Sequence, residues 1–487
     1  MLKVEKLIFE IGSAGRRGYS LPKLDVPDAD MKELIPEDLL RKSEAALPEV
    51  SELDCVRHFT RLSQLNYSVD TNFYPLGSCT MKYNPKINEK MASLPQFADL
   101  HPYQPESSVQ GMLELLYETE QMLCKICGMD AFTLQPAAGA HGELTGMLIV
   151  RAYHTSKGNP RKKVIIPDSA HGTNPASAAL CGYEVVAVKS DRNGRIDLDA
   201  LKSVVDGETA VMMLTNPSTL GLFEKNVRQI ADIVHKAGAL LYLDGANMNA
   251  LVGIARPGDM GFDICHVNLH KSFSTPHGGG GPGSGPVGVT AALSDYLPVP
   301  RVKIKRNRFI LDAESKKSVG RVRAFYGNTG VIIKAYCYMK SLGGDGLKDA
   351  TIEAVLNANY LKARLKGHYA LAVDDEPCMH EFVLTGKDKK GFGVKTLDIA
   401  KRLLDYGFYA PTIYFPLIVE EAIMIEPTET ESKDTLDSFV ETMIKVANEA
   451  RSEPGLLTSA PHSTPVRRLD EVLAARELNL RWKRPGA

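Results

Sequence analysis

The sequence has few of the features that mark membrane, secreted or nucleic-acid-binding proteins. It contains one tryptophan and eight cysteines in 487 residues, and so few cysteines in so long a chain do not make a disulfide framework. Lysine and arginine number 58 and aspartate and glutamate 59, which gives a formal net charge of -1. No charge excess is therefore present to attract nucleic acid or anionic lipid. No apolar run approaches the roughly 20 residues that a membrane-spanning helix needs.

These absences predict a soluble enzyme or subunit with no nucleic-acid partner and no membrane association. Several cysteines lie in apolar surroundings, as reduced core cysteines do; examples are Cys181, Cys265 and Cys337. We therefore expect a reducing compartment, the cytoplasm. Hydrophobic residues make up 44% and charged residues 24% of the chain, which is close to the average for globular proteins.

The length allows two to four domains. Changes in pattern along the chain predict an N-terminal arm over residues 1–90, a large domain over 91–328, a small C-terminal α+β domain over 329–455, and a linker with a terminal helix over 456–487. The arm is rich in proline and turn signals and has one helical stretch over 31–46.

Short apolar runs alternate with helical segments in the middle of the chain. Such runs are typical of buried parallel strands. One helical segment, 227–237, has apolar residues at helical spacing and Gly238 directly after it, which is a common stop signal. A second, longer helix is expected over 329–364. The predicted strands are 164–166, 185–188, 211–214, 240–243 and 265–269.

The alternation predicts an α/β fold in which a mostly parallel sheet carries helices on both faces. In such sheets ligands bind beyond the carboxyl ends of the strands. The residues that directly follow the predicted strands are therefore the candidates for function. Among them are histidines, an acid and a lysine. The candidates are His171, Thr215, Asn216, Asp244, Asn247, His270 and Lys271.

Two glycine-containing segments flank these positions. Ala138 and Gly139 stand at the start of a predicted helix, where free backbone N–H groups bind anions such as phosphate. The segment 276–285 is too rich in glycine for regular structure, and it would let the backbone approach a ligand or another chain closely.

A phosphate site, an acid and one lysine at a single sheet edge are what pyridoxal 5'-phosphate requires. Lys271 would bond to the aldehyde of this cofactor. Asp244 would keep the pyridine nitrogen protonated, so that the ring accepts electrons, and His171 would stack on the ring. Taken singly, each residue has a more ordinary interpretation, as a surface cation or a hydrogen-bonded core histidine. Their occurrence together at successive strand ends favours the cofactor.

Other ligands fit the pattern less well. A magnesium nucleotide site would need a Gly-x-x-x-x-Gly-Lys-Ser/Thr loop, and the chain has none. Cys124 and Cys127 have no second pair at zinc-finger spacing, so two core thiols are expected, and no metal site. The run Lys387–Lys390 predicts a solvated turn.

Several long motifs make the chain resemble the glycine cleavage P-proteins, the glycine dehydrogenases (decarboxylating), in their two-subunit form. The resemblance runs essentially from end to end. It is carried by Gly15–Pro22, Asn72–Pro85, Asp168–Ser177, Asp244–Ala250 and Asn268–Gly288.

The resemblance implies a fold-type I pyridoxal phosphate transferase fold with Lys271 as the cofactor lysine. It implies decarboxylation of glycine and transfer of the aminomethyl group to the lipoyl arm of H-protein. It also implies a homologous partner, subunit 1, in a heterotetramer of two plus two chains. Arg321, Arg323 and groups on the partner all compete for binding the glycine carboxylate.

Two other functions stay open at this point. One is a stand-alone pyridoxal phosphate amino-acid decarboxylase with another substrate. The other is a non-catalytic partner subunit, against which the presence of Lys271 argues.

Overall fold

The computed structural model describes residues 4–43, 45–278, 281, 283–373 and 376–482. The chain forms two compact units. Residues 1–71 and 462–487 make up the first, and residues 72–461 make up the second. No helix of the described residues is long and apolar enough to span a bilayer.

The first unit contains the helices α1 (Met31–Leu34), α2 (Glu52–Gln64) and α16 (Glu471–Arg476) and two short 3-10 turns, Ile8–Glu10 and Glu37–Leu39. Stacked rings of Phe9 and Trp482, with centroids 4.5 Å apart, join its two chain segments. The predicted helix over 31–46 is wrong, because α1 stops after one turn. Ile35 is extended there, as expected for a residue before proline.

A seven-stranded sheet forms the centre of the second unit, in the order β1-β7-β6-β5-β4-β2-β3. Strands β2 to β6 pair in parallel, whereas β7 runs antiparallel between β6 and β1. The mostly parallel sheet is thus confirmed. Its strands are β1 (Ala131–Thr133), β2 (Lys163–Pro167), β3 (Glu184–Val188), β4 (Thr209–Thr215), β5 (Leu240–Gly245), β6 (Ile264–Val267) and β7 (Val287–Val289).

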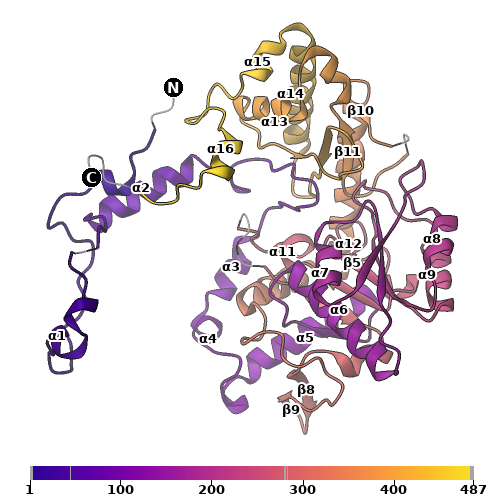
Figure 1. Cartoon of the computed structure of the whole chain (residues 1–487), viewed down its shortest axis with the longest axis horizontal. Helices are drawn as coiled ribbons and strands as arrows, with labels where there is room; N and C mark the ends of the chain where they lie inside the picture. Colours follow the sequence, from indigo (N-terminus) through magenta and orange to yellow (C-terminus); the bar gives the residue numbers. More distant parts are fainter. Residues whose placement is uncertain (1–3, 44, 279–280, 282, 374–375, 483–487) are drawn as a thin grey trace. The chain divides into compact units, whose positions relative to one another are not determined.

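Both faces of this sheet are buried, because successive side chains of its strands enter two different apolar clusters. On β5, for example, Leu241 and Leu243 belong to one cluster and Leu240 and Tyr242 to the other. The first cluster includes side chains of α5 (Gln110–Cys127), α8 (Leu198–Val204), α9 (Val227–Lys236) and α12 (Thr329–Leu365). The second includes side chains of α6 (Gly139–Ser156) and α7 (Thr173–Leu180). Figure 1 labels β5, the central strand of the sheet, with α6 and α7 nearby.

The expected burial fails at one strand. β3 is one of the two edge strands, and Val185 is 37% exposed. Its apolar composition resembles that of the buried strands, but unlike β1, the buried strand at the other edge, it is left partly uncovered by the elements around it. The helix predicted over 227–237 is confirmed as α9, and Gly238 follows it with φ 69°. The long helix expected over 329–364 is confirmed as α12, with a kink at Gly343.

A four-stranded antiparallel sheet, in the order β10-β11-β13-β12, lies in the C-terminal part of the second unit. It has its own apolar core, which includes side chains of the second half of α12 and of α14. Its elements are β10 (Ala370–Leu371), β11 (Phe382–Thr385), β12 (Thr412–Ile413), β13 (Ala422–Ile425), α13 (Thr396–Asp405), α14 (Lys433–Ser452) and α15 (Pro454–Thr458).

The remaining elements of the second unit are short. Strands β8 (Arg301–Lys305) and β9 (Arg308–Asp312) form a hairpin. The short helices are α3 (Lys86–Ala92), α4 (Pro95–Ala98), α10 (Pro257–Met260) and α11 (Leu269–Ser272), and the 3-10 turns are Glu106–Ser108, Ala291–Tyr296 and Lys387–Phe392.

The last of these turns corrects the prediction of a solvated lysine run. Lys389 is fully buried, and its Nζ donates to the carbonyl of His368 at 2.8 Å. The neighbouring lysines Lys387 and Lys390 pair with Glu420 on the surface.

The segment 72–85, which we call the connecting segment, contacts β13 of the small sheet and α11, the helix that follows β6 of the large sheet. Leu76 forms an isolated bridge with Ile425 of β13. Lys82 donates to the carbonyl of Ser272 at 3.1 Å and to Glu429 at 2.8 Å. The motif that stood out in the sequence therefore joins the end of α11 to the region after β13.

Candidate functional site

A cavity of about 240 Å³ lies at the carboxyl ends of the parallel strands. Side chains from the large sheet, from the connecting segment and from the start of β11 line it. The residues that line it include Ser78, Cys79, Gly139, Glu143, His171, Thr215, Asp244, Asn247, Asn268, His270, Lys271, His277, His380 and Glu381.

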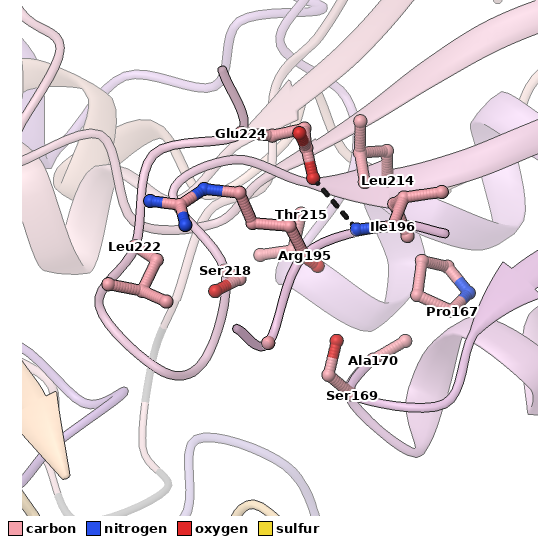
Figure 2. A pocket seen from close by; sticks show the side chains of 11 residues that line it. Pro167, Ser169, Ala170, Arg195, Ile196, Leu214, Thr215, Ser218, Leu222 and Glu224 are labelled. Atoms are coloured by element: carbon pink, nitrogen blue, oxygen red, sulfur yellow. Dashed lines mark hydrogen bonds between the residues drawn. The ribbon is translucent and has the colours of Figure 1, made fainter. Parts of the chain in front are cut away.

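A second, much smaller cavity shares one lining residue, Thr215, with this one. Figure 2 shows it between Leu214, Thr215, Leu222 and Glu224, with the carboxylate of Glu224 accepting from the N–H of Ile196 at 3.0 Å. Its volume of about 10 Å³ is about that needed for one water molecule. The larger cavity is therefore the candidate ligand site.

Lys271 lies on α11, directly after β6, as the sequence predicted. Its Nζ makes no hydrogen bond or ion pair with any residue that the structure describes. The short helix is fixed from outside the cavity, because the hydroxyl of Ser272 accepts from the N–H of Met248 at 2.7 Å. The amine of Lys271 thus reaches the cavity from a helix whose position is fixed by the hydrogen bond between Met248 and Ser272.

Asp244 is buried at the end of β5 and enters the same cavity. Its Oδ1 accepts from the N–H of Ala246 at 3.1 Å and lies 3.4 Å from Nε2 of His266, and its Oδ2 accepts from Asn174 at 3.1 Å. Burial opposes ionisation, but His266, these hydrogen bonds and Lys271 together lower the pKa of Asp244. Asp244 is therefore a carboxylate at neutral pH.

His171 lies in the turn before α7, with its Nδ1 2.9 Å from the hydroxyl of Thr173. Burial lowers its pKa, against the opposing effect of Asp244. His171 thus presents a neutral imidazole at the cavity, and its stacking on a cofactor ring stays a prediction.

The start of α6 and the end of the glycine-rich segment approach each other closely. A Cβ on Gly139 would lie 2.7 Å from the side chain of Asn268, and a Cβ on Gly285 would lie 2.1 Å from the carbonyl oxygen of Ala138. The sequence predicts that the glycine-rich segment lets the backbone approach a ligand or another chain. At Gly285 it lets the backbone approach Ala138 of the same chain. Gly279, Gly280 and Pro282 of the predicted segment lie outside the described residues.

The remaining predicted site residues differ in position. Thr215 lines the cavity, and its hydroxyl has no partner among the described residues. Asn247 also lines it, but its amide donates to Glu426 at 2.9 Å. Ala138, the N-cap of α6, and Asn216, whose Oδ1 accepts from the N–H of Glu224, lie beside the wall rather than in it.

His270 lines the cavity beside Lys271, and its Nδ1 accepts from the N–H of Ser284 at 3.2 Å. Burial, with Lys271 and His277 adding to it, lowers the pKa of His270 to about 4. His270 is therefore neutral, and its other nitrogen is left as a donor.

The sequence did not point to Glu143, which lines the cavity, or to Asn174 and His266, which contact the carboxyl groups of Glu143 and Asp244. Glu143 is buried, and its carboxyl accepts from Thr173 at 2.7 Å and from Asn174 at 3.1 Å. His266 is fully buried, and its Nδ1 lies 2.8 Å from the hydroxyl of Tyr242. A histidine inside an apolar strand and a glutamate inside an apolar helix were the available signals.

The opposite wall was also missed. His380 and Glu381 directly precede β11, and both are buried. Neither ring nitrogen of His380 has a hydrogen-bond partner in the described part of the chain. Glu381 accepts from the N–H of Ser78 at 2.7 Å. Burial and the nearby Glu426 raise the pKa of Glu381 to about 8.

The two arginines considered for a substrate carboxylate are not among the residues that line the cavity. Arg321 lies over the ring of Tyr103, 4.7 Å from its centroid. Arg323 lies near His141, whose pKa falls through burial and the charge of Arg323.

The residues present fit pyridoxal phosphate. Lys271 supplies the amine and Asp244 the ionised partner for a ring nitrogen. The first turn of α6 supplies N–H groups that have no partner within the helix. Thr215 and Asn268 each leave a buried oxygen without a partner among the described residues, and such atoms in a cavity wall are ready for a ligand.

The chain matches two described protein families. Residues 21–307 match "Glycine cleavage system P-protein", and residues 350–460 match "Glycine dehydrogenase, C-terminal domain". Two curated relatives have the name probable glycine dehydrogenase (decarboxylating) subunit 2. That of Caldanaerobacter subterraneus subsp. tengcongensis is 63% identical over 484 residues, covering 99% of this chain and 100% of the relative. That of Bacillus licheniformis is 59% identical over 481 residues, covering 99% of each.

Solved structures with the same fold include glycine decarboxylase (P-protein) of the glycine cleavage system in an inhibitor-bound form. It has a TM-score of 0.72 and 22% identity, covering 86% of this chain and 95% of that one. Oryza sativa TDC with PLP and tryptamine has a TM-score of 0.64 and 14% identity, covering 87% of this chain and 92% of that one. These likenesses confirm the fold-type I architecture. With the sequence matches, they lead to one conclusion: the chain belongs to the glycine cleavage system P-protein family.

Proposed function

We propose that this chain, with pyridoxal 5'-phosphate at Lys271, decarboxylates glycine and transfers the aminomethyl group to the lipoyl arm of H-protein. One observation carries the proposal. Lys271 and the ionised Asp244 line a single cavity, in a chain that is 63% identical to a probable glycine dehydrogenase (decarboxylating) subunit 2.

Each group in the cavity has a definite task in this function. Lys271 would hold the aldehyde carbon of the cofactor, and the N–H groups at Gly139 would hold the phosphate. His171 would pack against the ring, and Asp244 would keep a proton on the ring nitrogen by its charge. When bound, the cofactor supplies a ring that accepts the electron pair left as carbon dioxide departs. Thr215, Asn247 and His270 complete the wall around it.

The function includes a partner chain. In the first unit, α2 exposes apolar side chains, with Leu53, Val56 and Phe59 each more than half exposed. Apolar groups gathered on a surface mark protein contacts. Their presence supports contact with another chain. We propose that this other chain is subunit 1, in a heterotetramer of two plus two chains, and that the complex acts in the cytoplasm.

The test is a glycine carboxyl-exchange assay with labelled bicarbonate, run with this chain alone, with subunit 1, and with both plus lipoylated H-protein. We expect exchange to require subunit 1 and to rise with H-protein. Exchange by the chain alone at the full rate would instead favour a stand-alone decarboxylase.

A second measurement addresses Lys271 directly. Borohydride reduction of the holoenzyme should fix the cofactor on the peptide that contains Lys271, as read by mass spectrometry, and Lys271→Ala should abolish both labelling and exchange. Labelling of another lysine would contradict the assignment. No cofactor on the wild-type complex would favour a non-catalytic subunit.

A further inference from the structure

Glu143 is the one carboxyl group of the large-sheet wall that the proposed function leaves without a task. It lies in the second turn of α6, is 3% exposed, and lines the cavity. Its Oε1 accepts from the hydroxyl of Thr173 at 2.7 Å, and its Oε2 accepts from Nδ2 of Asn174 at 3.1 Å. A carboxyl group so completely buried needs a reason, because burial of a charge is costly.

The two donors lead to different parts of the site. The Thr173 hydroxyl lies 2.9 Å from Nδ1 of His171. The Asn174 amide also donates to Oδ2 of Asp244 at 3.1 Å. One side chain of α6 is thus connected to the imidazole at the ring face and to the carboxylate at the ring nitrogen.

The two carboxyl groups are in different charge states. Burial, with the nearby Asp244 adding to it, raises the pKa of Glu143 to about 8. Asp244 stays ionised, for the reasons given above. A carboxyl oxygen of Glu143 and one of Asp244 lie within 4.8 Å of each other. Two buried carboxyl groups at this separation do not both ionise at neutral pH. Glu143 is therefore the protonated member of the pair.

The titratable groups around Glu143 come from four elements. Tyr242 and Asp244 lie on β5. Burial, and after it the charges of Glu143 and Asp244, raise the pKa of Tyr242 well above its ordinary value. His266 lies on β6, with its Nε2 4.0 Å from Oε1 of Glu143. His171 precedes α7, and Lys271 lies on α11. Burial lowers the pKa of His266, against the opposing effect of Asp244.

We infer that Glu143 is a positioning residue that holds His171 and Asp244 in one hydrogen-bonded network, and that it does so as a neutral acid. The inference rests on the proposed function, because it assigns His171 and Asp244 to the cofactor ring. Glutamine has nearly the shape of a protonated glutamate and carries no charge, so it is the conservative replacement. Alanine removes the network altogether.

The first experiment compares Glu143→Gln and Glu143→Ala in the holoenzyme with subunit 1. We expect Glu143→Ala to lower kcat for glycine exchange by up to about 100-fold, because a small misplacement of reacting groups costs that much. Glu143→Gln should restore kcat to within a few-fold of wild type at pH 7. Equal losses in both variants would show that the carboxylate charge is needed and would overturn the inference, as would full activity of Glu143→Ala.

The second experiment reads the cofactor rather than the activity. The absorbance of the holoenzyme, titrated from pH 6 to pH 9.5, should show a step near pH 8 in wild type, as Glu143 loses its proton beside Asp244. Glu143→Gln should make the step smaller, and Thr173→Val, which removes the hydroxyl between Glu143 and His171, should keep it. Glu381 lines the same cavity and its pKa is also raised to about 8, so Glu143→Gln is compared in a Glu381→Gln background, where it should abolish the step. Glu184→Gln, on the exposed edge strand, is the control. A step that survives in the Glu143→Gln, Glu381→Gln double variant would overturn the inference.

Stability against pH gives a readout that needs no cofactor. The folded chain keeps the proton of Glu143 to about pH 8, whereas the unfolded chain releases it near the ordinary value of 4.5. The folded state binds more protons between these values, so stability falls as pH rises through that window. Glu143→Gln should make the fall of Tm shallower but not abolish it, because Glu381 titrates in the same window. An unchanged slope would overturn the inference.

These measurements separate the inference from the function on which it rests. Failure of the wild-type complex to exchange glycine would end the proposed function, yet the Tm comparison would still report on Glu143. Glu143, Asp244 and His266 also present ligand atoms within 4.8 Å of one another. Elemental analysis that found a metal ion removable by chelator, with loss of the pH 8 step, would overturn the inference in favour of a metal site.

Discussion

The two walls of the cavity satisfy their polar groups in different ways. On the large-sheet wall, Asp244 and Glu143 each accept hydrogen bonds at both carboxyl oxygens. On the wall that precedes β11, His380 is 2% exposed and has no hydrogen-bond partner on either ring nitrogen among the described residues. The two carboxyl groups of the large-sheet wall are thus satisfied within the protein, whereas the imidazole of His380 is not.

The difference indicates how the work of the site is divided. Groups that are fixed before a ligand arrives cost no reorganisation when charge develops, which suits the partner of a cofactor ring. A buried group without a protein partner carries a desolvation cost that a ligand can relieve. The carboxyl groups of the large-sheet wall are thus suited to a permanently bound ligand, and His380 is suited to a ligand that binds and dissociates in each turnover.

The largest expected effect is on Lys82, which ties the two walls together through Ser272 and Glu429. Lys82→Met should lower the free energy of unfolding by about 3–5 kcal/mol, because it leaves the carboxylate of Glu429, which is only 11% exposed, without a cation and with the hydroxyl of Tyr338 as its remaining donor among the described residues. Denaturant titration measures the change. The control is Lys340→Met, which breaks the exposed pair with Glu118 and should cost no more than about 1 kcal/mol. Similar losses in both would mean that Lys82 does not join the walls.

Asp244→Asn tests the role of the ionised carboxylate in the large-sheet wall. It keeps the shape of the side chain but removes its charge, so we expect the exchange rate to fall by about 100- to 1000-fold, with cofactor retained as judged by absorbance. Asp168→Asn is the control, because Asp168 also follows a strand but accepts from Ser190 and does not line the cavity. Turnover within about tenfold of wild type in Asp244→Asn would contradict its role.

Gly285→Ala tests whether the close approach beside the helix start is required. The new Cβ would lie 2.1 Å from the carbonyl oxygen of Ala138, so unfolding free energy should fall by about 1–3 kcal/mol, with weaker cofactor retention. Gly330→Ala is the control, since a Cβ there would meet no atom within 4 Å. Equal behaviour of the two variants in denaturant would show that the backbone there can shift freely.

The smallest effect has the opposite sign. His380→Leu removes a buried imidazole that has no hydrogen-bond partner among the described residues, so we expect the chain without ligands to gain about 1 kcal/mol of stability, while glycine exchange falls. The matched variant on the other wall is His266→Leu, which breaks the contact with Tyr242 and should destabilise the chain. Loss of stability in both variants would remove the distinction between the walls. Thermal unfolding of the two proteins side by side measures it.

Much of the large sheet could be predicted from the sequence. Strands buried on both faces need continuous apolar runs, and such runs are visible in β2, β4 and β5. The position of Lys271 followed from the same logic, since the carboxyl ends of parallel strands meet at one edge. The second wall could not be predicted, because His380 and Glu381 reach the cavity only through the packing of a second sheet.

The failures have local and tertiary causes that can be separated. The helix over 31–46 fails for a local reason, the proline at position 36. The exposure of β3 and the burial of Lys389 depend on which element packs next to them. A lysine in a run of lysines gives no sign that a carbonyl such as that of His368 will accept from it.

By itself, the sequence determined the α/β architecture, the lysine and the acid at the sheet edge, and the family, because periodicity and long motifs are properties of the chain in order. Only the tertiary structure decided which carboxyl group is charged and which keeps its proton. Glu143 and Asp244 are 101 positions apart in the chain, and their pKa values are set by burial and by each other. Such coupling between distant residues exists only once the helix and the strand that carry them have been packed together.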